Sequence, residues 1–302
     1  MSRRLWGMLL LLAFLWGGSF LFMRLAVQVW PPFTVVLSRV VLASALLWLL
    51  AALAGHRLPW SRPVLLACLG MALFNSLIPF SLIAWAQQSI PSSLASVVNA
   101  ATPVFAALMA HLATEDERLT RPRFGGVLLG LAGVAVLAGP AALGIEGGAE
   151  FPGILAGLGA CFSYALAVVW GRRFRRLGVA PLAAAAGQTS ACILLVLPLA
   201  LITDAPWHLP WPDRPTLLAI LALGLVSTGL AYALFFRVLA EGGATNTALV
   251  TQLVPVMAIL LGAGVLGEAL LPRHLAGMAL IACGFALLDG RLWERFRRSA
   301  PR

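Results

Sequence analysis

The feature that most constrains the fold is a series of ten long apolar runs, bounded by arginine, proline, glycine or acidic residues. A helix needs about 20 apolar residues to cross the hydrocarbon core of a bilayer. The runs are continuous and do not alternate between apolar and polar residues, so they predict membrane helices and not the strands of a barrel. We expect spans at 5–24, 33–54, 63–86, 92–112, 122–139, 152–171, 180–202, 215–237, 244–266 and 273–290.

Composition excludes a water-soluble globular protein. Hydrophobic residues make up 61% and charged residues 11% of the chain, and the mean hydropathy is +0.95. Soluble domains carry roughly 25% charged residues, so this chain lacks the charge to cover its surface against water. We therefore expect an all-α integral membrane protein whose surface is covered largely by membrane lipids.

The arginines predict how the chain is oriented. All 21 basic residues are arginine, and they stand in short groups between the apolar runs, such as Arg172 and Arg173. This placement is typical of cytoplasmic loops and does not form the basic face that would bind nucleic acid. Placing the N-terminus in the cytoplasm leaves only Arg24, Arg214 and Arg273 in outer loops. We predict an inner membrane protein with both termini in the cytoplasm.

Cysteines and histidines give no sign of a metal ion or cofactor. The four cysteines lie inside apolar runs without a Cys-x-x-Cys pair, and the four histidines are scattered along the chain. Such cysteines are typical of buried, unreactive thiols. We expect neither a cofactor nor a metal site.

The two halves of the chain repeat one another at an offset of roughly 150 residues. Rare residues carry this signal, because leucine and alanine coincide by chance in so apolar a chain. The matching pairs include Trp16 and Tyr164, Arg39 and Gln188, Phe80 and Tyr232, Asn75-Ser76 and Ser227-Thr228, Pro103 and Pro255, and Gly126 and Gly277.

Five spans in each repeat give the second copy the opposite orientation in the membrane. Inverted repeats of this kind recur in transporters, where the substrate site lies near the midplane of the bilayer. We predict ten transmembrane helices as two inverted-topology five-helix repeats around a central cavity. The repeats cover residues 1–140 and 152–290, and a basic cytoplasmic tail covers residues 291–302.

Several short patterns point to a known family. The first run contains Leu15-Trp16-Gly17-Gly18-Ser19-Phe20, and each repeat has an acidic residue before its glycine-rich last span, Glu117 and Glu268. Together with the repeat, these patterns resemble the EamA-type branch of the drug/metabolite transporter superfamily across essentially the whole chain. The resemblance implies that spans five and ten lie at the periphery and that the substrates are amino acids and related small metabolites, often exported.

Polar residues inside the runs are candidates for a substrate site, because polar groups in the hydrocarbon core usually face a cavity or another helix. A charge such as Arg39 costs at least ~2.5 kcal/mol at the helix centre. Arg39 either binds a substrate carboxylate through two hydrogen bonds or binds backbone carbonyls and keeps the repeats packed. The other polar candidates, whose alternative role is hydrogen bonding between helices, are Ser19, Asn75, Asn99, Gln188 and Gln252.

Four aromatic residues form a set that repeats between the halves: Trp16, Phe80, Tyr164 and Tyr232. They either line a cavity that stacks on substrate rings or pack the helices together. Ser92, Ser96, Asn99 and Thr102 share one face of the fourth span by their helical spacing. Gly126 and Gly130 form a Gly-x-x-x-Gly face, which leaves internal packing and a homodimer both open.

These observations favour an alternating-access transporter of small metabolites, above all amino acids, aromatic ones among them. An integral membrane enzyme is one alternative, but such enzymes need clustered acidic residues, histidine or lysine at one membrane face. The acidic residues at 115–117 have no histidine nearby except His111. A flippase for lipid-linked or phosphorylated sugars is the other alternative, and it needs several cations in the cavity where only Arg39 is available.

Overall fold

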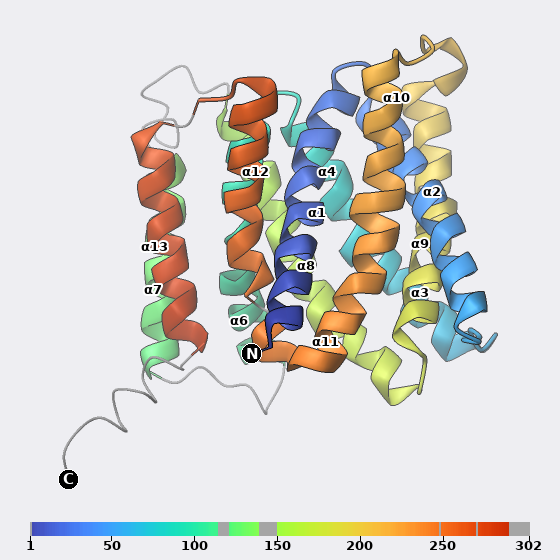
Figure 1. Ribbon diagram of the computed structural model, residues 1–302, viewed down its shortest axis with the longest axis horizontal. Helices are drawn as coiled ribbons and strands as arrows, with labels where there is room; N and C mark the ends of the chain where they lie inside the picture. The colour runs from blue at the N-terminus through green and yellow to red at the C-terminus, as the bar shows by residue number, and fades with distance from the viewer. Residues whose placement is uncertain (1, 114–120, 139–149, 248, 270, 290–302) are drawn as a thin grey trace.

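The computed structural model describes residues 2–113, 121–138, 150–247, 249–269 and 271–289, and within these ranges the chain forms helices and no strand (Figure 1). The described residues include four short helical segments of other types. Three are π-helical, η1 (Leu73–Leu77), η3 (Ala200–Asp204) and η5 (Ala222–Leu230), and η4 (Pro206–His208) is a 3-10 helix. The α-helices are α1 (Arg3–Val27), α2 (Pro32–Leu53), α3 (Arg62–Ala72), α4 (Ile78–Ala86), α5 (Ser92–Asn99), α6 (Thr102–Ala113), α7 (Arg121–Ala138), α8 (Phe151–Arg176), α9 (Pro181–Leu199), α10 (Arg214–Leu221), α11 (Ala231–Thr247), α12 (Val250–Leu266) and α13 (Pro272–Asp289).

Several consecutive elements join end to end into longer continuous helices that follow the apolar runs of the sequence. Seven continuous helices in the described chain are long and apolar enough to cross a membrane, and three shorter apolar helices lie in α7, α12 and α13. The all-helical fold is therefore confirmed. Figure 1 shows that α1 begins and α13 ends at the same end of the molecule.

Two of the expected span boundaries are wrong. The eighth span was expected to end at residue 237, but the long apolar helix that begins at Arg214 continues to Gly243. There the φ of 72° at Gly243 interrupts α11, a conformation that glycine adopts at little steric cost, so the expected start of the ninth span at residue 244 falls at this break. The sixth span was expected to end at residue 171, but α8 continues through its arginines to Arg176.

Two of the long helices contain π-helical segments at matching places in the two halves. Segment η1 joins α3 to α4, and η5 joins α10 to α11. Such π-helical turns are frequent at functional sites. The polar residues Ser76, Ser227 and Thr228 lie in these segments and are each at most 1% exposed, so both interruptions carry polar groups into the interior.

Helices α7 and α13 pair at one edge of the molecule (Figure 1) and approach through glycines. A Cβ atom at Gly133 would lie 2.8 Å from the carbonyl oxygen of Gly277, and one at Gly284 would lie 2.7 Å from the carbonyl oxygen of Gly126. The backbones are thus in direct contact, as at small-residue interfaces between membrane helices. The Gly126 face therefore has an internal partner.

Two carboxylates from the second half cap helices of the first half. Asp204 Oδ2 accepts hydrogen bonds from the backbone nitrogen (2.7 Å) and Oγ1 (2.9 Å) of Thr34, in the first turn of α2. Glu268 accepts hydrogen bonds from the backbone nitrogens of Ser92 (2.8 Å) and Ser93 (2.9 Å) and from both hydroxyls, at the start of α5. Both helices have a proline at the cap position that offers no capping side chain, so these carboxylates satisfy backbone donors left open at the helix ends.

The glycine contact predicts a large difference between two similar substitutions. Gly284→Ala places a methyl group against the backbone of α7, so we expect it to lower stability by about 1–3 kcal/mol. Gly125→Ala, whose Cβ would meet no atom within 4 Å, is the matched control and should be neutral or stabilising by up to about 1 kcal/mol. Thermal unfolding of the two purified variants in detergent checks this, and equal melting temperatures would contradict the contact.

The Glu268 cap predicts a pH-dependent stability. Partial burial opposes ionisation of Glu268, but the hydrogen bonds from Ser93 and Ser92 outweigh it and hold the pKa below its ordinary value of 4.5. The stabilisation is therefore complete above pH 4.5 and is lost as the pH falls through the lowered pKa. We expect Glu268→Gln to lower the melting temperature at pH 7 by about 2–4 °C and to have no effect once the wild-type carboxylate is protonated. A constant difference between the two proteins over pH 3–7 would contradict this.

Candidate functional site

A buried guanidinium lies where the two halves of the chain meet. Arg39, on α2, is 7% exposed. Its Nε donates a hydrogen bond to Thr228 Oγ1 of η5 (2.8 Å), and its Cζ lies 3.6 Å from the centroid of the Phe80 ring on α4. Thr228 Oγ1 in turn donates to the carbonyl oxygen of Leu223 (2.7 Å). The cation is thus held by one hydroxyl and one aromatic face.

A second polar group of the same cluster centres on Tyr232 of α11. Its hydroxyl accepts a hydrogen bond from Asn75 Nδ2 of η1 (3.0 Å), and the side chain of Gln188 on α9 lies close to it. In the sequence repeat, Gln188 corresponds to Arg39 and Tyr232 corresponds to Phe80. The contact between Arg39 and Phe80 in the first half therefore has its counterpart between Gln188 and Tyr232 in the second.

The surroundings of Arg39 contain polar but no acidic side chains. Tyr164, Tyr232 and Cys192 lie close enough to act on its charge. No carboxylate pairs with Arg39 in the described chain, where the ion pairs join Arg4 to Glu241 and Arg273 to Glu150. A buried cation without an anionic partner is energetically costly, and at membrane depth it is a candidate functional group.

A row of four aromatic rings connects Trp16 of α1 to Tyr232. The ring centroids of Trp16 and Phe235 are 5.4 Å apart, those of Phe235 and Phe236 are 5.3 Å apart, and those of Phe236 and Tyr232 are 6.5 Å apart. These spacings are typical of interacting aromatic pairs. Phe235 and Phe236 gave no signal in the sequence because they lie in an apolar run without a matching pair.

The structure therefore joins six of the predicted residues in one cluster and links a seventh to it. The six are Arg39, Asn75, Phe80, Tyr164, Gln188 and Tyr232, and Trp16 is linked through the aromatic row. Cys192 was missed, although it lies one helical turn after Gln188 and so on the same face of α9.

The other predicted site residues are placed less directly. Ser19 is partly buried on α1, and the side chain of Gln252 lies outside the described residues. Asn99 ends α5, and its buried Oδ1 has no hydrogen-bond partner in the described chain. The fourth-span hydroxyls of Ser96 and Thr102 donate locally, to the carbonyl oxygens of Ser93 and Asn99 (both 2.7 Å), so only their acceptor lone pairs are left for another group.

Two further hydroxyls near the middle of the fold are unsatisfied. Ser76 Oγ in η1 and Ser227 Oγ in η5 are fully buried without a hydrogen-bond partner among the described residues. They lie next to Asn75 and Thr228, which bond to the cluster. Unsatisfied buried hydroxyls are rare, and these two occupy neighbouring positions in the two matching π-helical segments.

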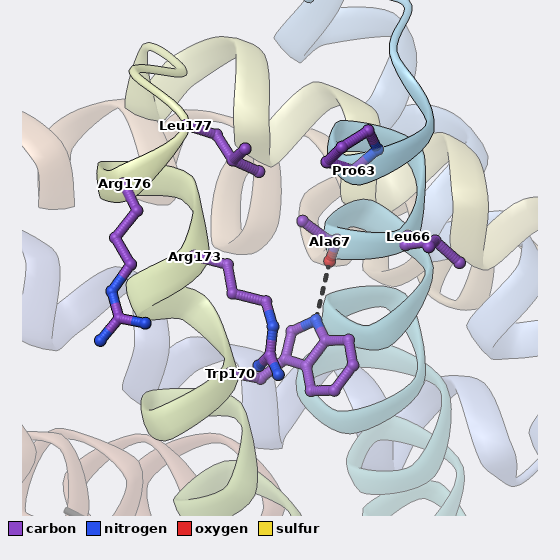
Figure 2. Close-up of a pocket in the computed structure, with 7 residues that line it drawn as sticks. All are labelled: Pro63, Leu66, Ala67, Trp170, Arg173, Arg176 and Leu177. Carbon is purple, nitrogen blue, oxygen red and sulfur yellow. Dashed lines mark hydrogen bonds between the residues drawn. The ribbon is translucent and has the colours of Figure 1, made fainter.

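The cluster is closed in this conformation. Arg39, Phe80, Gln188 and Thr228 are each at most 7% exposed, so a ligand reaches them only if the surrounding helices separate. A pocket with a volume of about 320 Å³ lies elsewhere, between the start of α3 and the end of α8 (Figure 2). Within the described ranges, histidine, cysteine and acidic side chains do not gather in groups of three that would suit a metal ion.

Comparison with known proteins gives a consistent picture. Residues 5–139 and 151–288 each match the model of the EamA-like transporter family. The chain is 31% identical over 271 residues to the uncharacterized inner membrane transporter YedA of Escherichia coli (strain K12), covering 88% of this chain and 84% of that protein. It is 27% identical over 292 residues to a probable amino-acid metabolite efflux pump of Salmonella typhimurium, covering 94% of each chain.

A solved crystal structure shares the fold, with a TM-score of 0.66 and 23% sequence identity over 99% of this chain and 100% of that one. The family match covers nearly the whole chain in two halves, and the transporter YedA is similar over most of its length. The protein is thus a multi-pass membrane protein of the transporter class. The chain belongs to the EamA-like transporter family.

Proposed function

We propose that this protein exports small metabolites, amino acids and related compounds with aromatic ones among them, across the inner membrane by alternating access. Membership of a transporter family supports the class of activity. The similarity to a probable amino-acid metabolite efflux pump supports the substrate class and the direction. The arginine distribution supports placing both termini in the cytoplasm.

The packing of the helices supports ten membrane crossings in two inverted repeats. Helix α1 packs on α12 as α8 packs on α5 and α6, and α2 packs on η5 as α9 packs on α3 and η1. Helix α2 packs on α9, and α7 packs on α13, as expected for elements that meet their own counterparts at a two-fold axis. The glycine contacts are reciprocal in the same sense, because Gly133 meets Gly277 while Gly284 meets Gly126.

The single observation that carries the substrate assignment is the buried guanidinium of Arg39, which has no carboxylate partner among the described residues. A carboxylate accepts two parallel hydrogen bonds from a guanidinium and neutralises its charge. The aromatic row ending at Tyr232 offers apolar faces for the rest of a small substrate. The site therefore suits a molecule with one carboxylate and an apolar or aromatic side chain.

The hydrogen bonds of the cluster supply a physical basis for alternating access. The bond from Arg39 to Thr228 joins the first half to the second, and so does the bond from Asn75 to Tyr232. A substrate that replaces these bonds compensates for their loss as the helices separate. In an empty carrier, water replaces these bonds, but it does not neutralise the charge of Arg39 as a carboxylate does.

Counterflow into liposomes tests the function and separates it from the alternatives. Purified protein is reconstituted, and labelled amino acids, the corresponding amino-acid amides, nucleosides and sugar phosphates are compared. Uptake of amino acids but not of their amides is the expected result. Uptake of sugar phosphates alone would favour a flippase for phosphorylated sugars, and the absence of all counterflow would contradict a carrier for these compounds.

Removal of the Arg39 cation should reduce transport without unfolding the protein. Arg39→Gln places at this position the residue found at the equivalent position 188, so we expect normal folding. The loss of a hydrogen bond to a charged group, about 1.5–3 kcal/mol, lowers kcat/KM for amino acids roughly 10- to 100-fold. Exposed Arg214→Gln is the control, and unchanged kcat/KM in the Arg39 variant would show that no substrate carboxylate binds there.

Tyr232→Phe tests the second half of the cluster. The substitution restores the residue type of the equivalent position 80 but leaves the Asn75 amide without its hydroxyl partner, at a cost of about 1–3 kcal/mol. We expect a changed ratio of kcat/KM between aromatic and small polar amino acids in a protein that still folds, with a melting temperature lowered by a few degrees. If every substrate shows the same kcat/KM as with wild type, the Tyr232 hydroxyl does not contribute to selectivity.

A further inference from the structure

The pocket between α3 and α8 is lined by residues that are not part of the transport cluster, and it has a distinct chemistry. It is lined by Pro63, Leu66 and Ala67 from the start of α3 and by Trp170, Arg173, Arg176 and Leu177 from the end of α8 (Figure 2). The end of the molecule at which α3 begins and α8 ends is the one at which α1 begins (Figure 1). By the arginine distribution this is the cytoplasmic end.

The wall of the pocket on α8 is built around a fixed indole ring. Trp170 Nε1 donates a hydrogen bond to the carbonyl oxygen of Ala67 (3.1 Å), as Figure 2 shows. The ring packs directly on Gly70, where the Cβ atom of any larger residue would overlap it. On this ring lies the guanidinium of Arg173, with its Cζ 3.6 Å from the centroid. The indole thus holds one cation at the pocket.

The remaining wall is apolar and open to the surroundings of the helices. Leu66 is 62% exposed and Leu177 is 36% exposed. Arg176 lies one turn after Arg173 on α8, also lines the pocket and is exposed. The pocket therefore combines two arginines with an exposed apolar surface, at the end of the molecule where α3 begins and α8 ends.

We propose that this pocket binds an anionic phospholipid of the cytoplasmic leaflet. Arg173 and Arg176 bind the phosphate group, and an acyl chain lies along Leu66 and Leu177. Charge complementarity favours an anionic lipid over a zwitterionic one, and the apolar wall favours a lipid over free phosphate. Among the described residues no acidic side chain lines the pocket, so none of them neutralises either arginine there.

Lipid binding is measured by native mass spectrometry of the full chain in a neutral detergent. Phosphatidylglycerol is titrated against phosphatidylcholine of the same acyl chains, with glycerol 3-phosphate as the headgroup alone. The wild type should bind phosphatidylglycerol more tightly than phosphatidylcholine and show no binding of glycerol 3-phosphate at the same concentration. Each arginine near the membrane surface contributes about 1 kcal/mol, so Arg173→Gln with Arg176→Gln should weaken phosphatidylglycerol binding roughly 25-fold.

Arg175→Gln is the matched control, because this exposed arginine lies in the same run but does not line the pocket, and its affinity should stay within about twofold of wild type. Arg173→Lys keeps the charge and should retain most of the preference for phosphatidylglycerol, which guards against a loss caused by misfolding. Equal binding of the two lipids to wild type would overturn the proposal. So would an equal loss in the Arg175 control and the double variant, since that would show unspecific attraction to the arginine run.

Discussion

The buried charge of Arg39 is the constraint around which the interior is arranged. In the described chain it has no carboxylate partner, and its neighbours are a threonine hydroxyl and the face of Phe80. Helices from both halves are needed to surround it, since α2 supplies the guanidinium and η5 supplies the hydroxyl. A buried charge is energetically unfavourable in a membrane interior. A bound anion that neutralises the guanidinium removes this cost and therefore binds more tightly. On this account, the closed cluster is a site prepared for an anion.

The rest of the fold allows the helices around this cluster to move relative to one another. The two halves meet through a few side-chain hydrogen bonds at the centre, whereas α7 and α13 are locked backbone to backbone at the edge. Asp204 and Glu268 cap helices across the halves at two further places. Substrate or water can replace these side-chain hydrogen bonds, whereas separating α7 from α13 would lose the close backbone contact at their glycines. Motion is therefore expected at the centre and rigidity at the α7 and α13 pair.

The sequence predicted the all-helical membrane fold because ten apolar runs leave few alternatives. It predicted much of the cluster because rare polar residues, such as Arg39 and Gln188, stand at equivalent positions of the two halves. It did not predict Phe235, Phe236 and Cys192, which carry no signal in an apolar run. The caps at Thr34 and Ser92 were also not foreseen, since their carboxylates come from distant loops. The end of the eighth span was misplaced because Arg237 was taken as its boundary, whereas the helix continues to Gly243.

The inversion of the two halves is the central claim, and equivalent loops test it most directly. Trp60 lies between α2 and α3 and Trp211 lies between α9 and α10, and they are 82% and 96% exposed. In a background without the native cysteines, single Trp60→Cys and Trp211→Cys variants are labelled in intact cells with a thiol reagent that does not cross the membrane. The account predicts that position 211 reacts from outside and that position 60 reacts only after the membrane is opened. Labelling of both positions from the same side would contradict the inverted arrangement.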